Sequence, residues 1–156
     1  MRETRGRDCA RRILIHGLAL ILAGLVWGII VPFTPFPRLA LTAHIEFEVN
    51  GLLVVALATL LLTVPHNVGP RSLRVVMATV WIIWAMMATE VANAWWGTTQ
   101  TLPIAAGQAG ATGGAPWQET VVKLAHVVGA VGLIATLTLI IAGFVTRPRG
   151  SNGPSV

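Results

Sequence analysis

The sequence predicts an all-α membrane protein, a bundle of four transmembrane helices with the N and C termini in the cytoplasm. Of the 156 residues, 54% are hydrophobic and only 11% are charged, whereas a soluble domain has about 25% charged residues. The hydrophobic residues lie in four long runs, each longer than the roughly 20 residues that a helix needs to cross a bilayer. A soluble globular protein is therefore excluded. The single cysteine, Cys9, also excludes an intramolecular disulfide and a cysteine-based metal site.

Each predicted helix follows from one hydrophobic run. The first helix is predicted over residues 13–33, after an arginine-rich segment, and the second over residues 39–64. The third is predicted over residues 73–96 and the fourth over residues 120–145. Prolines mark most of the boundaries, because proline cannot continue a helix from its interior. These prolines are Pro32, Pro35, Pro37, Pro65, Pro70 and Pro148. The connection 97–116 is long enough to fold over a site.

The basic residues predict the orientation, because short cytoplasmic loops collect lysine and arginine. Nine of the 11 lie in the N-terminal tail (1–12), in the connection between the second and third helices, or in the C-terminal tail (147–156). Only Arg38 and Lys123 fall on the other side. We therefore expect a multi-pass protein of a bacterial-type inner (plasma) membrane, with the transmembrane domain 13–146 between two cytoplasmic tails. Topology explains the positive charge, so nucleic acid is not an expected partner, whereas membrane lipid is.

Polar side chains inside the predicted helices gather in the outer half of the membrane. The second helix contributes His44, Glu46, Glu48 and Asn50, the third Glu90 and Asn93, and the fourth Gln118, Glu119, Lys123 and His126. Ionisable groups inside a membrane are costly and usually functional. The inner half is almost purely Leu, Val, Ile and Ala, so the polar groups do not continue into a permeation path. The group instead describes a pocket for a small aromatic molecule or for the edge of a haem.

Helical geometry divides the polar groups of the second helix between two faces. Each residue turns about 100° from the last, so residues four apart share a face. His44 and Glu48 lie on one face, and Glu46 and Asn50 on another that is roughly opposite. One face would look into its own bundle and the other at a neighbouring subunit. The second helix would then line a site between protomers.

Structural roles are the alternative for several single residues. A carboxylate in the first turn of a helix interacts favourably with the helix dipole, which would account for Glu48 and Glu119. The two asparagines could simply tie helices together through hydrogen bonds. Gly24 and Gly28 form a GxxxG spacing that favours close helix packing. An interfacial aromatic belt would account for Trp95, Trp96 and Trp117.

Several segments resemble one family of enzymes. The segment 37–51 (PRLALTAHIEFEVNG), with His44 six residues before Asn50 and Gly51, resembles the second helix of the hydroxylaminobenzene mutases. Three later blocks are similar to the same family: ANAWWG at 92–97, LPIAAG at 102–107 and WQE at 117–119. The spacing from histidine to Asn-Gly also resembles styrene oxide isomerase, a four-helix membrane enzyme that forms a trimer with haem b held between subunits. That enzyme uses a tyrosine shortly after the Ala-Asn pair, and this chain has no tyrosine.

The resemblance implies roles for particular residues. His44 would be the axial ligand of haem iron, and Asn50 would contact substrate near the metal. Asn93 matches the family's Ala-Asn pair and would face the same pocket. Glu46 matches the family's glutamate two positions after the histidine. The resemblance also implies haem b as cofactor and a homotrimer with haem between its subunits.

A mutase of this kind converts N-arylhydroxylamines such as hydroxylaminobenzene to 2-aminophenols by a Bamberger-like rearrangement. The hydroxyl moves from nitrogen to the ortho carbon, so the N–O bond must break heterolytically, which requires protonation or a Lewis acid. We expect Glu46, and second Glu90, to transfer protons, and haem iron on His44 to act as the Lewis acid. The expected walls of the substrate pocket are Trp95, Trp96 and Gln118.

Other functions remain open at this point. An epoxide-to-aldehyde rearrangement, as in styrene oxide isomerase, is the alternative within the same class. A b-type haem protein that transfers electrons would use two axial histidines, and His126 lies at a depth comparable to that of His44. A plain assembly or scaffold protein is the last alternative.

Overall fold

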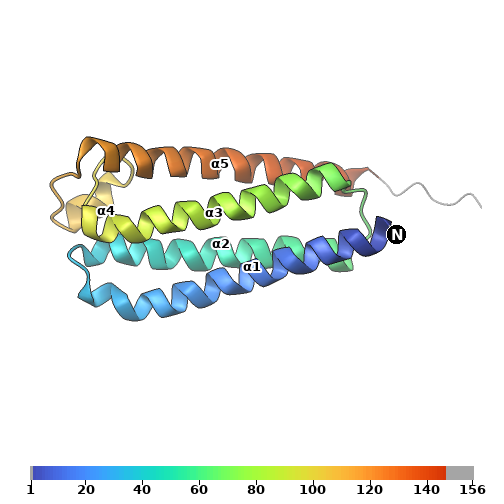
Figure 1. The fold of residues 1–156 in the computed structure, drawn as a ribbon, viewed down its shortest axis with the longest axis horizontal. Coiled ribbons are helices and arrows are strands. Elements are labelled where there is room, and N and C mark those ends of the chain that lie inside the picture. The colour runs from blue at the N-terminus through green and yellow to red at the C-terminus, as the bar shows by residue number, and fades with distance from the viewer. Residues whose placement is uncertain (1, 147–156) are drawn as a thin grey trace, which may run out of the picture.

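The computed structural model describes residues 2–146, which form a helical bundle without strands (Figure 1). The order along the chain is α1 (Arg2–Ile30), the 3-10 turn η1 (Val31–Phe33), α2 (Pro37–Thr63), α3 (Pro70–Trp96), α4 (Pro103–Gln108) and α5 (Pro116–Val145). Within these residues, the four long helices are each long and apolar enough to cross a membrane. The prediction of an all-α bundle with four membrane-spanning helices is therefore confirmed.

The helices differ most from the prediction in two places, and the other bounds shift by at most four residues. α1 begins at Arg2 rather than at residue 13, because arginine is a good helix former and no proline interrupts the basic segment. A short helix, α4, lies inside the connection 97–116, which was expected to be a loop. The predicted C-terminal tail, 147–156, lies outside the described residues. Each of the helices α2 to α5 begins with a proline, at the position where its missing N–H costs no hydrogen bond.

The long helices pack as two pairs. α1 runs along α2 and α5 runs along α3, and contacts between α2 and α3 join the pairs (Figure 1). Glycines of α1 bring the first pair close together. A Cβ atom at Gly24 would lie 2.9 Å from Phe47, and one at Gly28 would lie 2.9 Å from the ring of His44. The close packing predicted from the Gly24 and Gly28 spacing is therefore confirmed.

A polar contact joins the second pair far from the other polar groups. Thr136 of α5 donates a hydrogen bond to Thr79 of α3 at 2.9 Å, and Thr79 donates to the carbonyl of Gly132 at 3.1 Å. Among the described helices, α5 packs mainly against α3. Its remaining surface exposes large apolar side chains, as suits contact with lipid: Leu124, Val127, Val131, Ile134 and Ile141.

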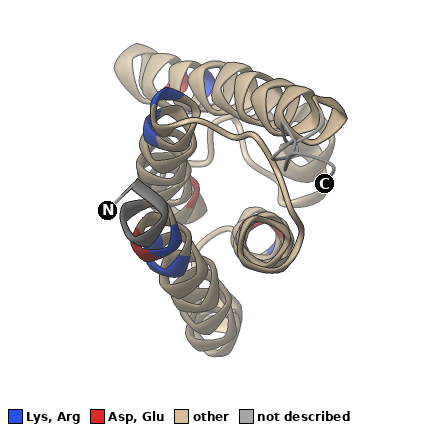
Figure 2. Cartoon of the chain, turned by 90° about the vertical axis from the view of Figure 1, so that its right-hand side faces the viewer, with Lys and Arg blue, Asp and Glu red and all other residues tan. Residues whose placement is uncertain are grey.

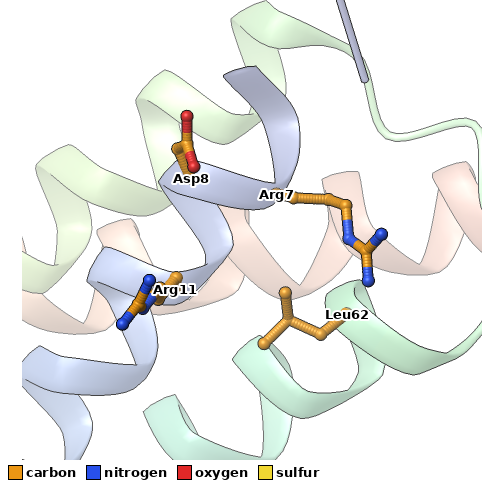
Figure 3. Close-up of a pocket in the computed structure, with 4 residues that line it drawn as sticks. All are labelled: Arg7, Asp8, Arg11 and Leu62. Atoms are coloured by element: carbon orange, nitrogen blue, oxygen red, sulfur yellow. The ribbon is translucent and has the colours of Figure 1, made fainter. Parts of the chain in front are cut away.

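The two ends of the bundle differ in charge. Arginines of α1 and α3 gather at the end nearest the viewer in Figure 2, where both α1 and α3 begin. A hollow of about 380 Å³ opens there, lined by Arg7, Asp8, Arg11 and Leu62 (Figure 3). The opposite end carries α4 (Figure 1). The glutamates of α2, α3 and α5 lie in the halves of these helices toward that end. The basic hollow is therefore remote from the polar groups described next.

The connection between α1 and α2 is fixed to the end of α3. The backbone N–H of Phe36 donates to the carbonyl of Ala94 at 3.1 Å. The Phe36 ring lies over Gly97, where a Cβ atom would come within 2.6 Å of it. Gly97 has φ +62°, a left-handed conformation that ends α3 and favours glycine. This contact holds the outer ends of α2 and α3 together.

Candidate functional site

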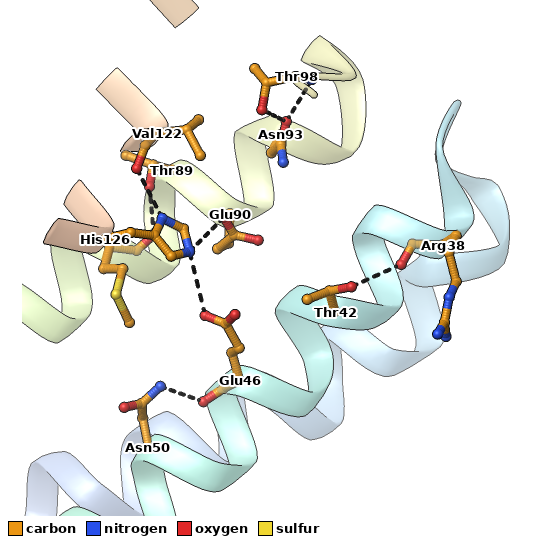
Figure 4. A network of polar contacts seen from close by, with 11 residues as sticks. Arg38, Thr42, Glu46, Asn50, Thr89, Glu90, Asn93, Thr98, Val122 and His126 are labelled. Carbon is orange, nitrogen blue, oxygen red and sulfur yellow. Dashed lines mark hydrogen bonds and ion pairs between the residues drawn. The ribbon is translucent and has the colours of Figure 1, made fainter. Parts of the chain in front are cut away.

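Three ionisable side chains from three helices meet in the half of the bundle that carries α4 (Figure 4). Nε2 of His126 on α5 lies 3.1 Å from Oε1 of Glu90 on α3 and 3.8 Å from Oε2 of Glu46 on α2. One ligand atom of each residue lies within 4.8 Å of the other two. We call this group the Glu46–Glu90–His126 cluster. It joins the first helix pair to the second.

The cluster contains buried polar atoms without hydrogen bonds. Glu90 is fully buried, and apart from the ion-pair contacts within the cluster, neither its carboxylate oxygens nor Nε2 of His126 has a hydrogen-bond partner. Buried polar groups in proteins are nearly always hydrogen-bonded, and an unpaired buried charge is costly. Additional protons, a cation or a polar substrate would each satisfy these buried atoms.

The orientation of His126 is set by its own helix. Nδ1 lies 2.9 Å from the carbonyl oxygen of Val122. A carbonyl can only accept a hydrogen bond, so Nδ1 carries a proton and donates it. Nε2 is then the atom that gains or loses a proton, and it is the atom that faces both carboxylates. The same arrangement would suit a metal ligand, since two carboxylates and an imidazole are ordinary ligands of Zn²⁺ and similar ions.

Two asparagines lie on the same helices as the two glutamates. Nδ2 of Asn50 donates to the carbonyl of Glu46 at 2.9 Å. Asn93 is fully buried one turn beyond Glu90, and its Oδ1 accepts the N–H and the hydroxyl of Thr98 at 2.9 Å and 2.7 Å. Nδ2 of Asn93 has no partner (Figure 4). A fourth unsatisfied polar group thus comes from the helix that carries Glu90.

His44 faces a different direction. Its Nδ1 donates to the carbonyl of Gly24 on α1 at 2.8 Å, and its Nε2 lies 3.6 Å from Oε1 of Glu48. The predicted division of the second helix into two faces is therefore confirmed. The face with His44 and Glu48 contacts α1, and Glu46 on the other face reaches toward α3 and α5. Within one chain, His44 and His126 do not share a site.

The predicted pocket walls lie around the outer end of the bundle. Trp95 is half exposed and packs against Trp27, with ring centroids 5.7 Å apart. Trp96 packs edge-on against the exposed Trp117, at 5.1 Å. Gln118 accepts the backbone N–H of Ala115 at 2.7 Å. The side-chain oxygen of Gln118 therefore caps the first turn of α5.

Glu119 anchors the long connection. Its carboxylate accepts the backbone N–H groups of Thr99 at 2.8 Å, Gln100 at 3.0 Å and Gly114 at 3.1 Å. Lys123, one turn further along α5, donates to the side chain of Gln100 at 3.1 Å. The two charged groups that precede His126 on α5 therefore hold the segment around α4 over the outer end of the bundle.

The sequence gives His126 a role only in the electron-transfer alternative, whereas the structure places it beside Glu46 and Glu90. The signal that could have found it was already present, because three helices each carry an ionisable residue at one level: Glu46, Glu90 and His126. Hydropathy does not specify which helices are neighbours, so it could not single out these three. No feature of the sequence predicted that Thr98 contacts Asn93.

Comparisons with known proteins agree with this architecture. The sequence profile of the styrene oxide isomerase family matches residues 9–145. Hydroxylaminobenzene mutase HabB of Ectopseudomonas oleovorans is 31% identical over 143 residues, which cover 92% of this chain and 85% of that protein. Hydroxylaminobenzene mutase HabA of the same organism is 33% identical over 117 residues, 70% of this chain and 79% of that protein. No solved structure matches. These matches confirm the resemblance predicted from the sequence.

Proposed function

Because the chain belongs to the styrene oxide isomerase family and is a membrane enzyme of the isomerase and mutase class, we propose that it converts N-arylhydroxylamines such as hydroxylaminobenzene to 2-aminophenols. One observation carries the choice of chemistry. Inside the bundle, the carboxyl groups of Glu90 and Glu46 lie 3.1 Å and 3.8 Å from Nε2 of the His126 imidazole. The names of the two relatives indicate the class of substrate.

The reaction needs an acid and a base but no net change in protons or electrons. The departing hydroxyl on nitrogen needs a proton, and the ortho carbon that receives the oxygen must lose one to restore the aromatic ring. Glu46 donates the first proton, and Glu90 accepts the second. The apolar interior keeps bulk water from the electron-poor ring. Asn50 and Asn93 provide amide groups for the polar end of the substrate.

The proposed walls of the substrate pocket are aromatic and polar residues at the outer end. Trp95 and Trp96 lie in the last turn of α3, beyond Asn93. Their rings stabilise positive charge that develops on the arene, through cation–π interaction. Gln118 lies in the first turn of α5, opposite the end of α3.

The proposed cofactor is haem b, with His44 as its ligand. The contacts of His44 fit this role, because Nδ1 donates to the Gly24 carbonyl, so that Nε2, which lies 3.6 Å from Glu48, carries the lone pair. Metal-ligating histidines usually donate their other N–H in this way. The ring also lies in a recess over Gly28 that a Cβ atom would fill. Ferric haem, when bound, would supply a Lewis acid.

The proposed assembly is a homotrimer in a bacterial inner membrane, with both termini in the cytoplasm. His44 is 24% exposed on the α1 side of α2, whereas Glu46 reaches toward α5. A group bound at His44 therefore needs a neighbouring subunit to meet a Glu46–Glu90–His126 cluster. This opposed orientation supports the proposal of a site shared between subunits.

Epoxide isomerisation is the second candidate function. It is favoured by the profile match, since the matching family is that of styrene oxide isomerase. Opening an epoxide to an aldehyde would use the same acid and the same sheltered pocket. The absence of any tyrosine from the chain argues for the mutase reaction first.

The test is a direct assay of the detergent-purified protein with hydroxylaminobenzene and, separately, with styrene oxide. We expect 2-aminophenol as the product of the first, with no added reductant or oxidant. The absorption spectrum is recorded before and after dithionite, beside that of His44→Ala. A Soret band that is lost in His44→Ala would support haem on His44. Conversion of styrene oxide alone would replace the mutase by the epoxide isomerase, and conversion of neither would reject both.

A further inference from the structure

We propose that His126 is the proton-transfer residue of this enzyme, and that its Nε2 passes a proton between the carboxyl groups of Glu90 and Glu46. The inference deepens the proposed function, on which its catalytic part rests. Neither the resemblance nor the comparisons assign His126 a role. With it, one cluster serves as both the acid and the base of the isomerisation.

The geometry places one nitrogen between two oxygens. Nε2 of His126 lies 3.1 Å from Glu90 and 3.8 Å from Glu46, and the three residues come from three helices (Figure 4). The hydrogen bond of Nδ1 to Val122 holds the ring in one orientation. Because Nδ1 keeps its proton, the ring can accept and release protons only at Nε2. Nε2 is thus the common neighbour of both carboxyl groups.

Burial increases along the row from Glu46 to Glu90. The side chain of Glu46 is 26% exposed, that of His126 is 19% exposed and that of Glu90 is 0% exposed. Glu90 therefore has no direct access to the surface of the bundle. His126 connects Glu90 to Glu46, whose side chain does reach the surface of the bundle.

Charge neutrality determines how many protons the cluster shares. In a low-dielectric interior an uncompensated charge is strongly disfavoured. With Nδ1 protonated, the cluster is neutral when two protons occupy three positions: Nε2 and the two carboxyl groups. These three positions belong to atoms that lie within 4.8 Å of one another, so a proton can pass from one to the next.

The catalytic cycle closes within the cluster. Glu46 gives its proton to the hydroxyl oxygen as the N–O bond breaks, and this oxygen leaves as water and adds to the ortho carbon. The carboxylate of Glu46 then takes the extra proton from this oxygen and passes it to the nitrogen, which becomes the amino group, and Glu90 takes the proton from the ortho carbon. The electron pair of that C–H bond restores the aromatic ring. His126 then accepts a proton from Glu90 and returns one to Glu46. Substrate and product are isomers, so no proton is gained or lost overall.

The other charged groups near the cluster are engaged elsewhere. Lys123 donates to Gln100, and Glu119 accepts three backbone N–H groups of the outer connection. His44 and Glu48 lie beside each other on the opposite face of α2. Among the described residues, Glu46, Glu90 and His126 therefore form a unit of their own.

The first test compares His126→Gln with His16→Gln. Glutamine forms hydrogen bonds but cannot carry a proton, so we expect kcat of His126→Gln to fall about 10²–10⁴-fold, with KM unchanged. His16 is also partly buried, where it accepts the indole N–H of Trp84 at 3.2 Å, and its replacement should leave kcat near wild type. Added imidazole should restore part of the activity of His126→Gly. An unchanged kcat in His126→Gln, or a loss that imidazole cannot restore, would overturn the proposal.

The second test does not require activity, so it separates failure of this inference from failure of the proposed function. In the Glu46→Gln background, the infrared carbonyl band of the Glu90 carboxylic acid is followed after transfer to D₂O. We expect hydrogen–deuterium exchange of this band to slow at least about tenfold when His126→Gln is added, because general acid–base transfer through the imidazole is lost. Equal exchange rates would overturn the proposal. So would a stoichiometric divalent metal that is lost in His126→Gln, since a cation would replace the shared protons.

Discussion

The imidazole of His44 lies directly against Gly28 of α1. A Cβ atom at Gly28 would come 2.9 Å from Cε1 and 3.0 Å from Nδ1 of the ring. The carbonyl of Gly24, one turn earlier in α1, accepts the N–H of Nδ1 at 2.8 Å. The GxxxG spacing therefore serves both helix packing and the placement of His44. Gly28 leaves room for the imidazole ring, and the carbonyl of Gly24 orients it.

Replacing Gly28 by alanine should disturb the packing of the His44 ring against α1. The added methyl group must displace the ring or separate α1 from α2, at a cost of about 1–3 kcal/mol. We expect a lower thermal midpoint and a smaller Soret absorbance per mole of protein. Gly107→Ala is the control, because a Cβ atom there would meet nothing within 4 Å. Identical midpoints and spectra for the two variants would contradict close packing of His44 against Gly28.

Replacing Glu46 by glutamine should lower turnover and leave the assembly intact. The amide keeps the size of the side chain but cannot donate a carboxylic proton, so we expect kcat to fall about 10²-fold or more. The subunit number and the haem content should stay as in the wild type. Asp8→Asn, at the opposite end of the bundle, serves as a control for removal of one carboxylate. Loss of haem in Glu46→Gln would assign Glu46 a structural role.

Replacing Glu119 by alanine should release the outer connection. Three part-buried backbone N–H groups would lose their acceptor, and a hydrogen bond to a charged group contributes about 1.5–3 kcal/mol. We expect faster proteolysis within residues 97–116 and a lower thermal midpoint. Thr120→Ala is the matched control, since Thr120 is exposed and bonds only to its own helix in the described structure. Equal cleavage rates in both variants would show that the carboxylate is not the anchor.

Gly97 contributes to stability in two ways, through its left-handed backbone and through its contact with the Phe36 ring, and replacing it by alanine should disturb both. The left-handed backbone alone costs a non-glycine residue about 1–2 kcal/mol, and the methyl group would also lie 2.6 Å from the Phe36 ring. Gly110→Ala introduces the same backbone strain, at φ +70°, with nothing within 4 Å. We expect Gly97→Ala to be clearly the less stable of the two in thermal unfolding. Equal midpoints would mean that the contact with Phe36 contributes nothing.

The sequence predicted what depends on one helix at a time. Hydrophobic length predicted each membrane-spanning helix, and the 100° turn per residue separated the face of His44 from that of Glu46. It could not predict what depends on how helices pair. That α5 packs on α3 brings His126 to Glu90, and no periodicity within either helix specifies this contact. The anchor at Glu119 depends equally on the path of the backbone around α4, in a segment whose composition favoured a loop.

The pairing of the helices has a consequence for how the protein is made. Glu46 belongs to the first pair, α1 and α2, whereas Glu90 and His126 belong to the second. A ribosome adds about 5–20 residues per second, so the roughly 80 residues from Glu46 to His126 take about 4–16 seconds to synthesise. A charged carboxylate at the bilayer centre costs about 2.5–3.5 kcal/mol on insertion scales, and during this interval Glu46 has no imidazole to share a proton with. The Glu46–Glu90–His126 cluster can therefore form only after α5 has been translated and has packed against α3.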